Sequence, residues 1–340
     1  MKRMTTRLRS LGRRLGAAGL AAGTLWAVTV TAGSETAAGA WKALRESSPM
    51  GALRWELGEL WVRDTLSPAA VLTLGESPLL LSARTLVPTD PSGYTVCGRA
   101  YISNTTDHTL DVTALTDTFD AELADDGPQI LILHTHGSEA YTPAAGTEVV
   151  WSGNHRTTDS RYNVVQVGDE MADVFSEAGI SVLHDRTLYD YPSYNEAYDR
   201  SLAAIESYLA QYPSLRFILD VHRDAIEDSQ GNEYKVVSSI DGVGTAAQLT
   251  LVVGSDGSGL PHPNWMENLK LAVALQEDLL TSYPTLMRPI LLRNSRYNQH
   301  ATTGSLLVEV GAAGNSPEEA ALAGRLFAQR MVEVLESRSK

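Results

Sequence analysis

The sequence predicts an α/β fold in which a mostly parallel sheet is flanked by helices. Two observations predict it. From Gly127 onward, short apolar runs alternate with longer segments of helical spacing, and the runs lack the polar alternation of strands with one wet face. Strands that alternate with crossover helices pair in parallel, because each crossover returns the chain to the same end of the sheet. The predicted domain covers residues 127–338, an ordinary size for one domain.

Glycine and proline mark the ends of the predicted helices. The segment Val164–Ala178 ends at Gly179, a common helix stop. Two longer helices end at Pro213 and Pro284, because proline cannot continue a helix. The predicted strands are, in chain order, Gln129–Leu133, Ile180–Leu183, Arg216–Val221, Ala246–Gly254 and Leu306–Val310. The predicted helices are Val164–Ala178, Tyr194–Tyr212, Trp265–Tyr283 and Ser316–Ser337.

Residues 34–126 carry mixed signals and are predicted to form a stalk or accessory region. Met50–Val62 has the spacing of a short amphipathic helix. Ala69–Leu81 is apolar but contains a glycine and a proline. Cys97 is the only cysteine, so no internal disulfide is available, and we expect it to be a small buried hydrophobe rather than a nucleophile.

The amino terminus has the pattern of a membrane signal anchor. Residues 1–14 contain six basic residues and no acid, and we assign them to the cytoplasm by the positive-inside rule. Residues 15–33 are uncharged and long enough for a transmembrane helix. A cleaved signal peptide is the alternative, with Ala32, Ala37 or Ala38 at the cleavage site. Both interpretations place the rest of the chain outside the cytoplasm, as a single-pass protein of the cell membrane if the anchor is kept.

The charge distribution excludes one class of partner. The net charge is −14 overall, which leaves −20 on the residues that follow the basic segment. Non-specific binding to nucleic acid needs a basic surface, so we expect no nucleic-acid partner.

Three predicted strands end in side chains that bind metals or transfer protons. In α/β sheets, ligands bind outside the carboxyl ends of the strands. Two histidines and one carboxylate form the ligand set of a catalytic zinc that keeps one position for water. A further carboxylate is needed to move a proton from that water to the leaving amine. These residues follow or lie within the first, third and last strands: His134, His136 and Glu139; Asp220 and His222; Glu309.

We predict that His136, Glu139 and His222 bind the metal and that Glu309 is the general base. His136 and Glu139 form an H-x-x-E pair, which lets both side chains converge just past a strand. Imidazole together with carboxylate suits Zn²⁺ better than magnesium or calcium, which prefer oxygen ligands alone. Glu309 lies inside an apolar strand, where an unpaired carboxylate is costly to bury.

Two alternative ligands remain open at this point. His134 lies two residues before His136, so it points to the same side of an extended chain. If it is not a ligand, His134 is expected to orient the site or the substrate. Glu148 lies in the loop that follows and is the substitute for Glu139.

Three further residues are predicted to hold the substrate. Arg223 follows His222 directly and could bind a substrate carboxylate or steady the oxyanion; an ion pair with Asp224 is the alternative. Arg296 and Asn298 lie in a loop before the last strand and are candidates for holding glycan or peptide.

The motifs of this region resemble those of the stage II sporulation protein P family. The resemblance covers Tyr101 to the carboxyl end, whereas residues 34–100 carry no recognised family motif. It rests on Ile130 to Tyr141 (ILILHTHGSEAY), Tyr191 to Ser201 (YPSYNEAYDRS), Ile218 to Ala225 (ILDVHRDA), Arg296 to Gln299 (RYNQ) and Leu306 to Asn315 (LLVEVGAAGN).

The resemblance implies a zinc-dependent cell-wall hydrolase. It implies a fold like that of N-acetylmuramoyl-L-alanine amidases, amidase activity on peptidoglycan, and endopeptidase activity on the cross-links. It also implies a role in engulfment during sporulation, in a complex with sporulation proteins D and M. The H-x-x-E pair and the later histidine are similar to those of zinc carboxypeptidases, which is an analogy.

Two other functions fit the sequence. One is an exported zinc peptidase that acts on proteins. The other is a non-catalytic scaffold that binds the cell wall, although a scaffold has no need of the histidines and Glu309.

Overall fold

The computed structural model describes residues 81–337, except residue 125 and residues 228–232. The predicted transmembrane helix at residues 15–33 and the predicted helix Met50–Val62 lie outside these residues. Among the helices that the structure describes, none is both long and apolar enough to cross a bilayer.

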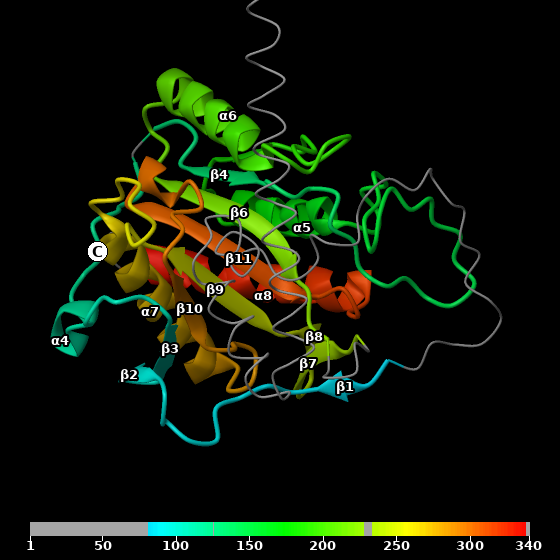
Figure 1. The fold of residues 1–340 in the computed structure, drawn as a ribbon, viewed down its shortest axis with the longest axis horizontal. Coiled ribbons are helices and arrows are strands. Elements are labelled where there is room, and N and C mark those ends of the chain that lie inside the picture. The colour runs from blue at the N-terminus through cyan, green and yellow to red at the C-terminus, as the bar shows by residue number, and fades with distance from the viewer. Residues whose placement is uncertain (1–80, 125, 228–232, 338–340) are drawn as a thin grey trace, which may run out of the picture. The chain divides into compact units, whose positions relative to one another are not determined.

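The described residues form an eight-stranded sheet with helices on both faces (Figure 1). Its strands, from one edge to the other, are β2 (Thr95–Cys97), β3 (Ala100–Asn104), β10 (Ile290–Arg293), β9 (Leu249–Gly254), β11 (Gly304–Ala312), β6 (Phe217–Asp224), β4 (Ile130–Leu133) and β5 (Val182–His184). The α/β class predicted from the sequence is therefore confirmed.

The sheet is mixed, so the prediction of a mostly parallel sheet is wrong. β9 runs antiparallel to β11 in the middle of the sheet, and β2 runs antiparallel to β3 at one edge. The chain goes from β6 to β9 through the hairpin of β7 (Lys235–Ile240) and β8 (Gly244–Ala247), and from β10 to β11 through a 3-10 turn at Gln299–Ala301. Neither described connection holds a crossover helix, which is what keeps neighbouring strands parallel.

The strand predicted at Ala246–Gly254 is interrupted at Gln248, which separates β8 from β9. The buried Gln248 amide accepts a hydrogen bond from the Leu86 backbone nitrogen and donates to the carbonyls of Leu86 and Thr285. These hydrogen bonds fix the segment that follows β1 (Ala83–Arg84). Strand β1 itself pairs with β7, and β1, β7 and β8 form a small three-stranded sheet.

Strands β2 and β3 lie within the region predicted as a stalk, and they form one edge of the main sheet. The short helix α4 (Val112–Leu115) also belongs to this region. Residues 95–104 are thus part of the same sheet as the predicted catalytic domain, although they precede its predicted start at residue 127.

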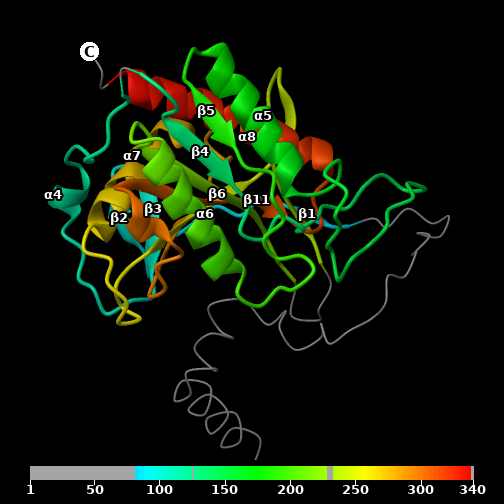
Figure 2. The same ribbon diagram turned by 90° about the horizontal axis from the view of Figure 1, so that it is seen from above.

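Three helices cover one face of the sheet, and one helix covers the other. α5 (Val164–Glu177), α7 (Trp265–Ser282) and α8 (Pro317–Glu336) lie on the same side, and α6 (Ala197–Gln211) lies on the opposite side (Figure 2). All four match helices predicted from the sequence. Side-chain caps determine where two of these helices begin. Asn163 caps α5, and Ser316 with Glu319 forms a capping box at the start of α8.

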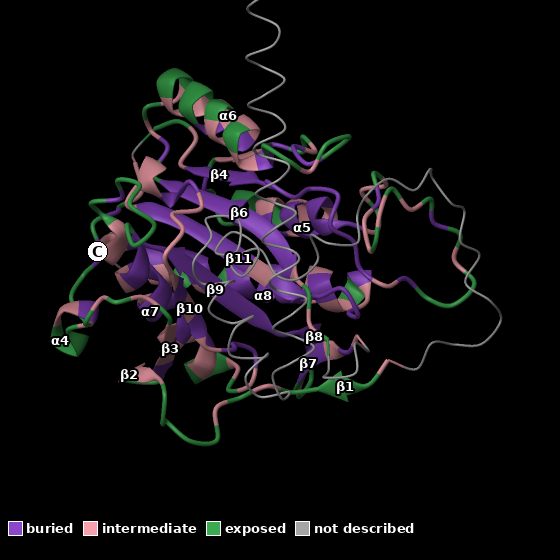
Figure 3. Cartoon of the chain, viewed as in Figure 1, coloured by how far each residue is buried: buried purple, intermediate pink, exposed green. Residues whose placement is uncertain are grey.

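Successive side chains of the central strands point to opposite faces of the sheet. One face packs into the larger hydrophobic core, and the other carries the polar residues of the candidate site. In β6, Phe217, Leu219 and Val221 pack into the core beneath α5, α7 and α8, whereas Ile218 packs with residues of α6. Because successive side chains of a strand point to opposite faces, Asp220 and His222 lie on the face that α6 covers. Figure 3 shows the central strands buried while α6 keeps an exposed outer side.

Candidate metal centre and catalytic site

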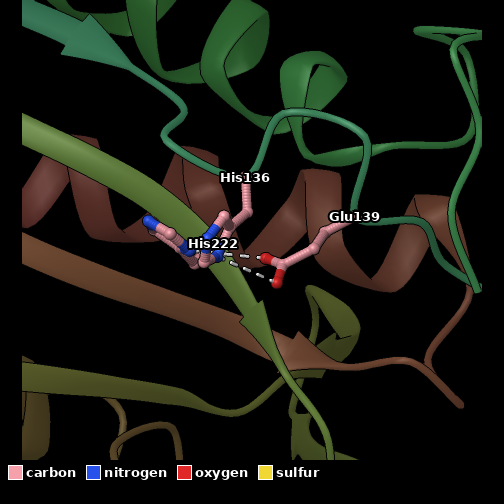
Figure 4. Close-up of side chains that lie close together, drawn as sticks. All are labelled: His136, Glu139 and His222. Carbon is pink, nitrogen blue, oxygen red and sulfur yellow. Dashed lines mark ion pairs between the residues drawn. The ribbon is translucent and has the colours of Figure 1, made fainter. Parts of the chain in front are cut away.

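Three buried side chains converge at the carboxyl ends of β4 and β6. His136, Glu139 and His222 each offer a ligand atom, and these atoms all lie within 4.8 Å of one another. Figure 4 shows the Glu139 carboxylate pointing toward the two imidazole rings. These are the three residues that the sequence analysis selected as ligands, and no fourth histidine, cysteine or carboxylate from the described residues joins the group.

Local backbone structure brings these side chains together. Immediately after β4 the chain turns, and the Glu139 backbone nitrogen donates to the His136 carbonyl oxygen at 2.9 Å. This turn places both residues of the H-x-x-E pair on one side. His222 comes from the adjacent strand β6, which pairs in parallel with β4, so the carboxyl ends of the two strands lie at the same edge of the site.

Two of the separations between these side chains are close to those expected between the ligands of a zinc ion. His136 Nδ1 lies 3.6 Å from Glu139 Oε1, and His222 Nδ1 lies 3.4 Å from Glu139 Oε2. Ligands about 2.1 Å from a tetrahedral zinc are separated from each other by about 3.4 Å. A tetrahedral zinc ion held by these three residues would keep one position for water.

The protonation states also fit a cation site. Burial would raise the pKa of Glu139, but the imidazoles of His136 and His222 hold it well below its ordinary value. Burial lowers the pKa of His136, so its ring is neutral and able to bind metal. Burial opposes charge on His222 too, yet Asp220 and Glu139 raise its pKa well above the ordinary value. A metal ion would take the place of that proton.

Asp220 fixes the orientation of His222. Its Oδ1 lies 2.9 Å from His222 Nε2, on the side of the ring away from Glu139. The Asp220 carboxylate also accepts hydrogen bonds from the backbone nitrogen and hydroxyl of Thr135 at 2.8 and 2.6 Å. Such contacts hold the ring of a metal-binding histidine in one tautomer and orientation. The sequence signal was available, since Asp220 lies two residues before His222 and therefore on the same face.

Arg156 contacts Glu139 directly and His136 through Tyr194, and it was not among the residues predicted from the sequence. Its Nη2 lies 3.4 Å from Glu139 Oε1, and its Nη1 is paired with Asp190 at 2.5 Å. Its guanidinium lies over the Tyr194 ring, and that ring stacks on His136 with 4.6 Å between ring centroids. Arg156 lies in an irregular loop, where no periodic pattern could have identified it.

Glu309 lies beside the three converging residues, on β11. Its Cα pairs with that of His222 across the parallel strands, and paired residues point to the same face of the sheet. Burial raises the pKa of Glu309 to about 8, with further contributions from the negative charges of Asp224 and Glu139. Its Oε2 atom is buried and has no hydrogen-bond partner in the described part of the chain. A cation bound beside Glu309 would lower this pKa and leave the group as a carboxylate, which is the form a general base requires.

The two alternative ligands lie elsewhere. The His134 ring packs against α5 on the opposite face, where Nδ1 lies 2.9 Å from the Val221 carbonyl oxygen and Nε2 lies 2.8 Å from His184 Nε2. A Cβ on Gly168 of α5 would stand only 2.6 Å from His134 Nε2, so glycine makes room for this ring. Glu148 is exposed in its loop and does not belong to the converging group.

The three predicted substrate residues have different surroundings. Arg223 is buried, and its guanidinium donates to the backbone carbonyls of Ala140, His155 and Asp224, so it braces the loop after β4. The Asn298 amide donates to the Tyr198 carbonyl and to the Ser201 hydroxyl of α6. Arg296 is partly exposed and donates to the Pro261 carbonyl.

Comparison with known proteins gives a family match, a curated relative and more distant solved structures. The stage II sporulation protein P of Bacillus subtilis (strain 168) is 29% identical over 203 residues, which are 56% of this chain and 47% of that protein. This chain therefore spans about half the length of the curated relative it matches.

Solved structures give a more distant likeness. The CwlD amidase from Clostridioides difficile, in complex with the GerS lipoprotein, has 13% sequence identity and a TM-score of 0.39, covering 62% of this chain and 99% of that one. The catalytic domain of CwlV, an N-acetylmuramoyl-L-alanine amidase from Bacillus (Paenibacillus) polymyxa var. colistinus, has 14% identity and a TM-score of 0.37, covering 63% and 98%.

The family match covers most of the chain. The family model of stage II sporulation protein P matches residues 98–332, which include every strand of the main sheet except β2, together with the converging residues and Glu309. The resemblance seen in the sequence motifs is confirmed, and the chain belongs to the stage II sporulation protein P family.

Proposed function

We propose that this protein is a zinc-dependent peptidoglycan hydrolase, an N-acetylmuramoyl-L-alanine amidase that remodels the cell wall during sporulation. The observation that carries the proposal is the convergence of His136, Glu139 and His222 beside Glu309 on one face of the sheet. Membership of the stage II sporulation protein P family supports the biological setting.

The reaction is hydrolysis of the amide between lactyl-muramic acid and L-alanine. A zinc ion held by His136, Glu139 and His222 would supply a water molecule of lowered pKa and a positive charge beside the substrate carbonyl. Glu309 accepts a proton from the attacking water through its unpartnered Oε2. Glu309 then returns that proton to the nitrogen as the carbon–nitrogen bond breaks, which leaves a lactyl carboxylate and a free alanine amine.

The neighbouring side chains keep this geometry fixed. Asp220 directs the Nδ1 of His222 toward Glu139. Tyr194 lies flat against the His136 ring, which limits its rotation. Because the ligands are held before substrate arrives, little free energy is lost in ordering them during the reaction.

The proposal includes a location and an organisation. Residues 1–14 are cytoplasmic, and residues 15–33 anchor the protein in the membrane. Residues 34–126 connect the anchor to the enzyme and contribute β2 and β3 to its sheet, and residues 127–338 form the rest of the catalytic domain with an amidase-like fold. The enzyme then acts outside the cytoplasm. Sporulation proteins D and M are the proposed partners, and cleavage of peptide cross-links is the proposed second activity.

Replacement of Glu309 by glutamine tests the assignment. The Glu309→Gln protein is expected to retain zinc at the wild-type ratio, because residue 309 is not one of the ligands, and to release no peptide from purified sacculi. Zinc content is measured by metal analysis and peptide release by chromatography. If this variant hydrolyses sacculi at the wild-type rate, Glu309 is not the general base.

The two competing functions give different results in the same assays. A zinc peptidase would cleave casein and leave muropeptides intact. A scaffold would bind sacculi without releasing peptides and would contain no zinc after mild purification.

A further inference from the structure

A pocket opens on the sheet face that carries His222 and Glu309. It is a cavity of about 410 Å³, lined by residues 85–88, by Thr250 of β9, and by Arg288 and Pro289 just before β10, together with Tyr94, Ser103 and Leu291. Figure 1 shows β9, β10 and β3 lying side by side in this half of the sheet. We call it the β9–β10 pocket.

The strand register places this pocket next to the catalytic centre. Thr250 is the Cα partner of Glu309 across β9 and β11, and Glu309 is the partner of His222 across β11 and β6. Paired residues of neighbouring strands point to the same face. The side chains of Thr250, Glu309 and His222 therefore form one row across the sheet, with the pocket at one end and the proposed metal site at the other.

Two of the residues that line the pocket have buried polar atoms without partners in the described part of the chain. Arg288 is 92% buried, since its exposed fraction is 8%. Its Nη1 donates to Asp224 Oδ2 at 2.8 Å, whereas its Nε and Nη2 are buried and have no hydrogen-bond partner in the described part of the chain. Thr250 Oγ1 is also buried and without a partner there. Burying unpaired donors is costly. A ligand group that pairs with them therefore contributes more binding free energy than the same group would at an exposed site.

The unpaired edge of Arg288 defines the chemistry of the missing partner. Nε and Nη2 form the fork that pairs with both oxygens of one carboxylate. Asp224 and Glu309 are acidic and lie close by, so general charge attraction does not favour an anion here. Recognition must come from direct hydrogen bonds, and an arginine-to-lysine change should therefore abolish it.

We propose that the β9–β10 pocket is a subsite for a carboxylate of the peptidoglycan stem peptide, bound by the Nε–Nη2 edge of Arg288 and by the Thr250 hydroxyl. This inference rests on the proposed function, because it takes peptidoglycan as the substrate. The first carboxylate after the scissile amide is the α-carboxylate of the D-glutamate that follows L-alanine. The subsite directs the peptide across β9 and β10, and it leaves the side of His136 and Tyr194 to the sugar.

A pair of substrates that differ only at this carboxylate tests the subsite. Full-length protein is assayed on muramoyl-L-alanyl-D-glutamate and on its D-isoglutamine counterpart, in which the α-carboxylate is an amide. The expected kcat/KM ratio favours the free acid by about 10- to 100-fold, the effect of one charged hydrogen-bonding group. Arg288→Lys and Thr250→Val are both expected to reduce this ratio. Arg293→Lys, at the end of β10 and outside the pocket, is the matched control and should keep it.

Binding of the product peptide separates failure of the subsite from failure of the proposed function. Isothermal titration of full-length protein with L-alanyl-D-glutamate and with L-alanyl-D-isoglutamine is expected to show tighter binding of the acid, lost in Arg288→Lys. The Thr250→Val variant keeps the Asp224–Arg288 ion pair, so it remains informative if Arg288→Lys fails to fold.

Three outcomes are distinct. Hydrolysis of both substrates at equal rates, with equal binding of both dipeptides, overturns the subsite and leaves the amidase proposal intact. Selective binding of the acid that depends on Arg288, without any hydrolysis, supports the subsite and refutes the amidase proposal. A wild-type preference that survives both Arg288→Lys and Thr250→Val also overturns the subsite.

Discussion

Asp220 offers a sharp test of how the candidate metal centre is built. Its carboxylate approaches His222 Nε2 at 2.9 Å and accepts two hydrogen bonds from Thr135. An Asp220→Asn change keeps the size of the side chain but removes its charge and one acceptor oxygen. Removing a residue that orients a metal-binding histidine typically costs about 10- to 100-fold in metal affinity, so we expect zinc affinity to fall by roughly that much.

The assay is competition for zinc between the full-length protein and a chromophoric chelator at neutral pH. Asp185→Asn is the matched control, because Asp185 is also buried and its carboxylate accepts hydrogen bonds from Thr187 and Tyr189, away from His222. Circular dichroism checks that both variants fold. If Asp220→Asn binds zinc like the wild type, or if the control loses as much affinity, then Asp220 does not orient the ligand.

Three further predictions concern stability and metal. Burial lowers the pKa of His262 to about 4, so folding favours its neutral form and stability falls as pH drops below about 6.5. Between pH 7.5 and pH 5 this histidine should cost about 2 kcal/mol in urea unfolding, and His262→Gln should lose that much less than the wild type. Gly168→Ala should lower stability by about 1–3 kcal/mol, despite the better helix propensity of alanine, because its Cβ would meet the His184 and His134 rings at 2.4 and 2.6 Å; an unchanged thermal midpoint would contradict this packing. Chelation should abolish hydrolysis of sacculi, added zinc should restore it, and magnesium should not.

The helices and the buried strands followed from patterns that act over short distances. The Ser-Pro-Glu-Glu sequence at Ser316 to Glu319 predicts a helix start because the side chains satisfy the first backbone groups of α8. The runs that became β4 and β6 were recognisable because both faces of each strand are covered by apolar neighbours.

Strand direction and several of the strands, β7 and β10 among them, were not predictable in the same way. β10 is only four residues long and directly follows Pro289, so it lacks a long apolar run. β7 contains two serines and pairs with β8 at the side of the main sheet. The antiparallel pairing of β9 and β11 depends on connections without crossover helices, which a list of elements does not reveal.

Some residues of the candidate site were also predictable from local sequence patterns, whereas others were not. His136 and Glu139 are joined by one turn, and His222 lies at a strand end, so local spacing was enough to bring all three to notice. Arg156 and Arg288 reach the site from an irregular loop and from a segment before β10. Their roles depend on contacts between distant parts of the chain, for which one sequence carries no periodic signal.

We propose that this protein cleaves the amide between muramic acid and L-alanine with a zinc ion and Glu309. Mass spectrometry of sacculi digested with full-length protein tests it most directly. We predict release of stem peptides with a free L-alanine amino terminus, lost in Glu309→Gln and in the presence of chelator. Products cut only between peptide residues, or release that continues with chelator present, would contradict the account.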